Sequence, residues 1–186
     1  LMRGIVFTAF LTFLDERRDF GVSNRVLNES EADLETSAFT SVNHYPSRDL
    51  KALLASATRI LDEPFSEMVK EFGEFLFDHL MDRLSMHVEN YDTWQSMLIN
   101  VEDTIHESIH KLEPNRRIPV ALKQVEDANT ALTLHYKSPR GMADLAEGLI
   151  KGCLKHYSAE QAVTIARFDR SADGTSSIFK MTYEST

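Results

Sequence analysis

The fold is decided at LHYKSPRGMADLAEGLIKG, Leu134 to Gly152, where an extended pattern changes into a helical one. The first residues close the run TALTLHYKS (130–138), whose alternation is typical of a strand, and MADLAEGLIKGCLKHY (142–157) has helical spacing. Gly148 and Gly152 interrupt this helix, at about 1 kcal/mol each relative to alanine. We therefore expect the helix to pack closely against a neighbouring surface.

Further strands are expected on both sides of this stretch. VALKQVED (120–127) precedes it, and AVTIARFDRS (162–171) and SSIFKMTYES (176–185) follow it. The last two runs flank Ala172-Asp173-Gly174-Thr175, and Asp-Gly between alternating runs is a strong hairpin signal. The part from about 114 to 186 is therefore predicted to follow the order β-β-α-β-β.

The N-terminal part, about 2–113, is predicted to be mainly helical. Its apolar spacing is helical in LKALLASATRILD from Leu50, in FSEMVKEFGEFLFDHLMDRL from Phe65 and in TWQSMLINVEDTIHESIHKL from Thr93. Glu113-Pro114 ends the last of these helices. A helical part packed on a C-terminal antiparallel sheet with its own helix makes an α+β fold, and we expect residues 1–186 to form one domain.

Composition excludes several classes of protein. Lys and Arg number 20 against 29 Asp and Glu, a net charge of −9, so the basic footprint of a nucleic-acid binder is missing. The apolar run Ile5–Leu14 has about half the length of a membrane-spanning helix, so no membrane span is expected. Cys153 is the only cysteine, which excludes an internal disulfide and a cysteine-based zinc cluster and favours a reducing cytoplasm.

The segment His106-Glu107-Ser108-Ile109-His110 matches the H-E-x-x-H signature of zinc peptidases. The extended form of that signature would have Gly and His where this chain has Glu113 and Arg116. Helical geometry places His106 at the edge of the apolar stripe and His110 further toward the polar side. A zinc-dependent hydrolase using His106, Glu107 and His110 remains the alternative function.

A second polar group lies at the end of the predicted strand. In an extended chain Tyr136, Ser138 and Arg140 point to one side and present two hydroxyls and a guanidinium together. Such a row suits a carboxylate, which arginine grips through two hydrogen bonds. The alternative is an ordinary edge strand with solvated polar residues.

Together these segments resemble the H-NOX family of haem nitric oxide/oxygen binding domains, related to the haem domain of soluble guanylate cyclase. The resemblance covers essentially the whole chain: MRGIVFTAF at the start, FGEFLF at 72–77, IHESIHKLEP before Pro114, and YKSPR leading into ADLAEGLIKG. The Y-x-S-x-R motif is its specific part. The resemblance implies a haem b between the helical part and the sheet part.

The resemblance also implies roles for individual residues. His106, eight residues before Pro114, would be the axial ligand of the haem iron. Tyr136, Ser138 and Arg140 would hold the haem propionates. Pro119 would press on the porphyrin, and Val6 would take the place of an aliphatic residue that packs on the haem.

Departures from the oxygen-binding branch favour nitric oxide. That branch has a tyrosine nine residues after the motif tyrosine, where this chain has Leu145. Phe10 and Leu76, with Phe77 beside the latter, stand where that branch has a tryptophan and an asparagine. Bound O₂ requires a hydrogen-bond donor, whereas NO binds ferrous iron in an apolar pocket. We expect O₂ to be excluded, with CO as a further ligand.

The resemblance thus implies a cytoplasmic, haem-based sensor of NO without catalytic activity. Binding of NO would weaken the iron bond to His106 and bias a two-state rearrangement. The signal would pass to a separate partner, a histidine kinase or an enzyme of cyclic-di-GMP metabolism. A third hypothesis is that the same pocket takes an anionic ligand other than haem.

Overall fold

The computed structural model describes residues 2–30, 39–88, 91–100, 122–128 and 130–184. The N-terminal part is helical, as predicted, and residues 94–100 are helical as well. The elements of the described residues are β1 (Met2–Arg3), α1 (Gly4–Arg17), α2 (Val22–Glu29), β2 (His44–Tyr45), α3 (Ser47–Leu61), α4 (Phe65–Val88), β3 (Leu122–Ala128), β4 (Ala131–Lys137), α6 (Ala143–His156), β5 (Val163–Phe168) and β6 (Ser176–Tyr183).

The C-terminal part has the predicted β-β-α-β-β order and is antiparallel throughout its described strands. The strand order is β3-β4-β6-β5, so β4 is an inner strand and the edge-strand alternative for Tyr136 is wrong. The predicted hairpin is confirmed, with Phe168 opposite Ile178 at its closed end. The α+β fold class is therefore confirmed.

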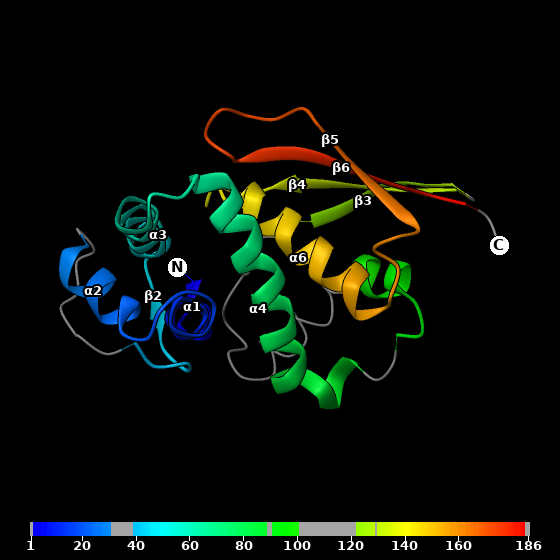
Figure 1. The fold of residues 1–186 in the computed structure, drawn as a ribbon. Coiled ribbons are helices and arrows are strands. Elements are labelled where there is room, and N and C mark those ends of the chain that lie inside the picture. Colours follow the sequence, from blue (N-terminus) through cyan, green and yellow to red (C-terminus); the bar gives the residue numbers. More distant parts are fainter. Residues whose placement is uncertain (1, 31–38, 89–90, 101–121, 129, 185–186) are drawn as a thin grey trace.

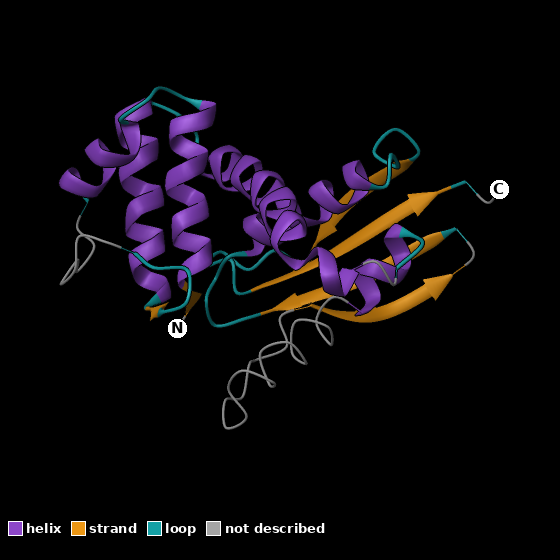
Figure 2. Cartoon of the chain, turned by 90° about the horizontal axis from the view of Figure 1, so that it is seen from below, coloured by secondary structure: helices purple, strands orange, loops and turns teal. Residues whose placement is uncertain are grey.

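The elements form a helical end and a sheet end. Helices α1, α2 and α3 gather on one side, while α6 lies along one face of the sheet (Figure 1). Figure 2 shows the same division from below, with α4 and α6 between the N-terminal helices and the strands. Of the described helices, none combines the length and apolar character needed to cross a membrane.

A two-stranded sheet lies apart from the main one and was not predicted. Met2 pairs with Tyr45 and Arg3 with His44, in antiparallel register. Each strand has only two residues, too few for an alternating pattern in the sequence. This pairing joins the start of α1 to the start of α3.

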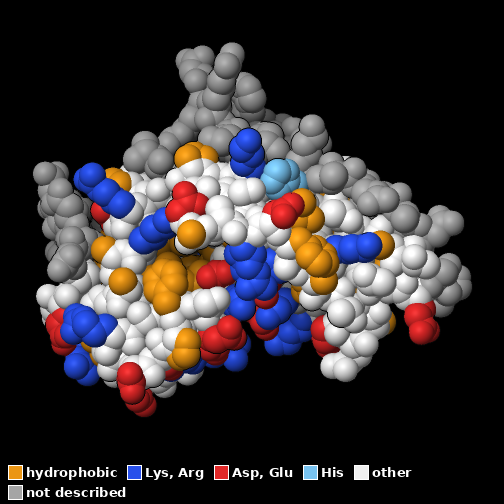
Figure 3. All heavy atoms as spheres, turned by 90° about the horizontal axis from the view of Figure 1, so that it is seen from above, with side chains coloured by type: hydrophobic (Ala, Val, Ile, Leu, Met, Phe, Trp, Pro, Cys, Tyr) orange, Lys and Arg blue, Asp and Glu red, His pale blue; other side chains and the backbone are white. Residues whose placement is uncertain are grey.

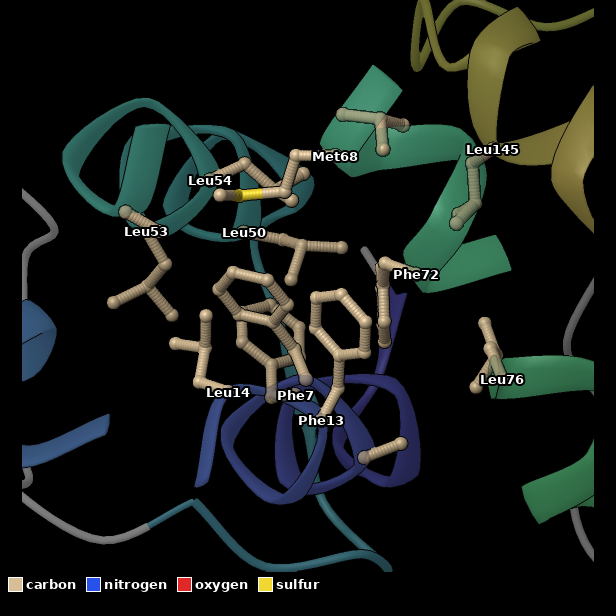
Figure 4. Close-up of a cluster of buried hydrophobic side chains, with 14 of the residues drawn as sticks. Phe7, Phe13, Leu14, Leu50, Leu53, Leu54, Met68, Phe72, Leu76 and Leu145 are labelled. Atoms are coloured by element: carbon tan, nitrogen blue, oxygen red, sulfur yellow. The ribbon is translucent and has the colours of Figure 1, made fainter. Parts of the chain in front are cut away.

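Two apolar clusters share α4. The first contains buried side chains of α1, α3 and α4, and Figure 4 shows them facing one another: Phe7, Phe13, Leu14, Leu50, Leu53, Leu54, Met68, Phe72, Leu76 and, from α6, Leu145. The second lies between α6 and the sheet and includes Phe77, Ile150 and Phe179. Leu76 and Phe77 are neighbours in sequence but belong to different clusters, so α4 packs on both sides.

The predicted close packing of the glycines in α6 is confirmed, and α4 is the neighbour. A Cβ atom on Gly148 would overlap the carbonyl oxygen of Lys70 and lie 2.8 Å from the Cα of Gly73. A Cβ atom on Gly152 would lie 2.6 Å from the Cβ of Phe77. The two helices therefore approach backbone to backbone, where a side chain does not fit.

Charged side chains are mixed on the surface. On the face drawn in Figure 3, Lys and Arg side chains lie beside Asp and Glu side chains instead of forming a basic field. This distribution agrees with the net charge of −9.

Candidate anion-binding turn and apolar cluster

The Y-x-S-x-R residues lie at the turn that joins β4 to α6. Strand β4 ends at Lys137, and the amide of Gly141 donates to the carbonyl oxygen of Ser138 at 3.2 Å. The expectation of one extended row from Tyr136 to Arg140 is therefore wrong, because the chain turns at Ser138. The three residues are brought together by the turn and not by strand alternation.

The polar atoms of this turn are tied to the backbone around them. Ser138 is only 3% exposed, and its Oγ accepts a hydrogen bond from the amide of Arg140 at 3.3 Å. The hydroxyl oxygen of Tyr136 accepts one from the amide of Met142 at 3.2 Å. Accepting these bonds leaves each hydroxyl its own proton to donate, which suits an anion near Arg140.

The first apolar cluster begins one residue beyond the turn, at Met142. Met142 and Leu145 are buried members of the first cluster, together with Phe10 and Leu76. The ring of Phe10 meets that of Phe72 edge-on, with centroids 5.0 Å apart, and Val6 packs at the margin of the same cluster. The structure therefore brings together Val6, Phe10, Leu76 and Leu145.

Phe77 is separated from that group. It belongs to the second cluster, where its ring lies 5.9 Å from that of His156 and its Cβ faces Gly152. Its side chain thus packs against the C-terminal half of α6, near Gly152 and His156, unlike that of Leu76.

The histidine motif falls outside the described residues, as do Pro114 and Pro119. This applies to His106, Glu107 and His110 alike. In the part of the chain that the structure describes, no three or more His, Cys, Asp or Glu residues gather in a way that could hold a metal ion.

The described residues fit a haem by their chemistry. Hydroxyl and guanidinium groups at the turn match the carboxylates of a porphyrin, and the adjoining buried leucine, methionine and phenylalanine side chains match its hydrocarbon body. Tyr136 and Met142 connect the two parts through one hydrogen bond. An amphiphilic anion with a large apolar body is the ligand class that this arrangement suits.

An ionic cluster that joins α6 to β5 and α4 was not predicted from the sequence. Arg167 of β5 pairs with Asp144 and, at 3.0 Å, with Glu147, and Glu147 also lies 3.6 Å from Nζ of Lys70 in α4. The side chain of Arg167 is only 7% exposed. Its signal was present, because Val163, Ile165 and Arg167 occupy alternate, inward-facing positions of the strand.

The thiol of Cys153 is a packing group. Cys153 is fully buried in the second cluster, and burial raises the pKa of its thiol to about 12. Since the thiolate is the reactive form, this cysteine is inert in the folded protein.

Comparison with known proteins identifies relatives of the whole chain. Residues 3–165 match the family model of haem-NO-binding (HNOB) domains. The ferrous unliganded H-NOX protein of K. algicida is 24% identical, with a TM-score of 0.84, and the match covers 100% of this chain and 98% of that one.

Two structures from Shewanella oneidensis are similarly close. The H-NOX protein in its Fe(II)NO state is 24% identical over 98% of this chain and 99% of that one, with a TM-score of 0.84. The Fe(II)CO state, determined by NMR, is 24% identical over 100% of both chains, with a TM-score of 0.82. No curated protein sequence matched the chain.

Proposed function

The chain belongs to the haem-NO-binding family, and from that premise we propose that it is a sensor of nitric oxide that signals to a separate protein. Haem is the cofactor of this family, and its domains are sensors without catalytic activity of their own. The observation that carries the proposal is the turn at Ser138–Gly141, whose donors lie directly beside a buried apolar cluster.

We assign the haem contacts to the residues proposed from the sequence. His106 would hold the iron through a neutral imidazole, and Pro119 would lie against the porphyrin. Tyr136, Ser138 and Arg140 would hold the carboxylates as hydrogen-bond donors. Bound haem supplies a ferrous iron that takes up the gas. We treat residues 1–186 as one domain in this proposal.

Selectivity for NO over O₂ follows from the apolar side chains. Phe10, Leu76 and Leu145 are buried in one cluster, and none of them carries a hydrogen-bond donor. An apolar surrounding withholds the hydrogen bond that stabilises bound O₂, while NO and CO bind without it. Val6 adds a further aliphatic surface at the margin of this cluster.

An absorption spectrum of the reduced protein tests the proposed function. We expect a Soret band that shifts on adding NO or CO and stays unchanged under O₂. Colourless protein with stoichiometric zinc would establish the hydrolase that uses His106, Glu107 and His110. Colourless protein that binds another amphiphilic carboxylate would establish the third hypothesis.

The variant Leu145→Tyr tests the basis of selectivity. Leu145 is 6% exposed and packs in the same cluster as Phe10 and Leu76, so a tyrosine hydroxyl there would bring a donor into an apolar surrounding. We expect measurable O₂ binding by absorption spectroscopy, with Leu145→Phe as the control of equal bulk. If neither variant binds O₂, the geometry around the haem, and not the missing donor, sets the selectivity for NO over O₂.

The signalling partner belongs to the proposal as well. We propose a histidine kinase or an enzyme of cyclic-di-GMP metabolism as the protein that receives the signal. The H-NOX resemblance supports this choice, and a lone, buried cysteine is compatible with a cytoplasmic location.

A further inference from the structure

The tip of the β5–β6 hairpin supplies acceptors to the turn between β4 and α6. The amide of Ser138 donates to the carbonyl oxygen of Thr175 at 2.9 Å, and the amide of Ala143 donates to that of Gly174 at 3.2 Å. Ala143 is the first residue of α6, where an amide has no acceptor within the helix. The hairpin tip therefore holds the turn at both of its ends.

Two glycines allow this contact. A Cβ atom on Gly174 would lie 3.0 Å from the carbonyl oxygen of Gly141, and one on Gly141 would overlap that of Asp173. Both have positive φ angles, +71° for Gly174 and +61° for Gly141, which disfavour other residues. Arg140 immediately precedes Gly141, so any shift of Gly141 moves the base of the guanidinium side chain.

The tip is ordered by its own hydrogen bonds. The carboxylate of Asp173 accepts from the hydroxyl of Thr175 at 2.7 Å and from its amide at 3.1 Å. These bonds hold the pKa of Asp173 at about 2, below its usual range. Ser171 closes the other side, since its Oγ accepts from the amide of Ser176 at 2.8 Å. The conformation of the tip is therefore held by bonds within the hairpin and does not depend on the turn that it contacts.

We propose that the hairpin tip Ser171–Thr175 is a positioning element for haem, which sets where Ser138 and Arg140 meet the carboxylates. The inference rests on the proposed function. It assigns no direct haem contact to the hairpin. Gly174 and Thr175 act through the backbone of the turn, and Asp173 acts through Thr175.

The variant Gly174→Ala tests this role against a matched control. Gly21 also has positive φ, +90°, but a Cβ atom there meets nothing within 4 Å. Gly21→Ala therefore reproduces the backbone strain without displacing a neighbour. We expect haem transfer to a scavenging globin to be about tenfold faster for Gly174→Ala, the effect of losing one hydrogen bond to a charged group, and unchanged for Gly21→Ala.

Hydrogen exchange gives a readout that does not depend on haem loss. The amides of Ser138 and Ala143 should exchange faster in Gly174→Ala and keep their wild-type rates in Gly21→Ala. Unchanged exchange at both amides would overturn the inference. If Gly174→Ala does not fold, Thr175→Val removes the hydroxyl that Asp173 binds and is expected to show the same changes at smaller amplitude.

A double-mutant cycle separates positioning from general destabilisation. If the hairpin acts partly through Arg140, adding Gly174→Ala to Arg140→Ala should speed haem loss by a smaller factor than Gly174→Ala does in the wild type. Additive effects would overturn the inference. Wild-type protein without a Soret band would overturn the proposed function as well, whereas haem-loaded wild type with equal rates for Gly174→Ala and Gly21→Ala would overturn the inference alone.

Discussion

The substitution Gly148→Val is expected to prevent the chain from folding to a stable protein. Its Cβ would overlap the carbonyl oxygen of Lys70 and lie 2.8 Å from the Cα of Gly73, so both obstacles are backbone atoms of α4. Backbone cannot turn aside as a side chain does, and the helices must separate. Overpacking against side chains costs about 1–3 kcal/mol, so we expect a loss above ~4 kcal/mol here, a large share of a typical domain stability.

Urea unfolding followed by circular dichroism measures this effect. Lys155→Val places the same β-branched residue at an exposed position of α6 and controls for helix propensity, with an expected loss of about 0.5 kcal/mol. Gly152→Ala is an intermediate case, because its obstacle is the Cβ of Phe77. A Gly148→Val protein as stable as Lys155→Val would mean that α4 and α6 do not cross at this glycine.

Glycine at His106 is expected to produce the largest loss of haem. The proposed function gives His106 the only protein bond to iron, and removing it leaves the porphyrin held by apolar contacts and its carboxylates. We expect haem loss to be at least about 100-fold faster, on the order of 3 kcal/mol. Free imidazole should restore retention, because it replaces the missing ligand in the space left by the side chain.

His110→Ala is the matched control for this variant. It removes a histidine from the same motif, four residues away, and a single axial ligand at His106 predicts wild-type haem loss. Equal loss in both variants would contradict that assignment. Loss of bound zinc from both, in protein without a Soret band, would favour the hydrolase.

Much of the fold was predictable because its signals are local. Helices α3, α4 and α6 each carry enough turns for helical periodicity to appear, and Asp173-Gly174 marked the hairpin between β5 and β6. The backbone contact at Gly148 was also predictable, since a glycine that weakens a helix requires a packing reason.

Other features depend on distant parts of the chain. The pairing of Met2 with Tyr45 joins strands too short to show a pattern. The sequence predicts extended chain through Arg140, because Pro139 favours extension of the residue before it. The turn forms instead after Ser138, and the acceptors that hold it come from the distant Gly174 and Thr175. For the site, the motif marked the polar residues. Helical geometry points Leu76 and Phe77 in different directions, but which part of the chain each one meets depends on tertiary packing.

Because Leu76 and Phe77 pack in different clusters, α4 does not tolerate an inserted or deleted residue in its middle. One inserted residue before Leu76 would advance the rest of the helix by about 100° and 1.5 Å. The later buried side chains would then turn away from the clusters in which they pack, and Phe77 would lose its contact with Gly152. An insertion in the middle of α4 is therefore expected to disrupt both clusters, whereas one in the connection between α6 and β5 would leave the register of α4 unchanged.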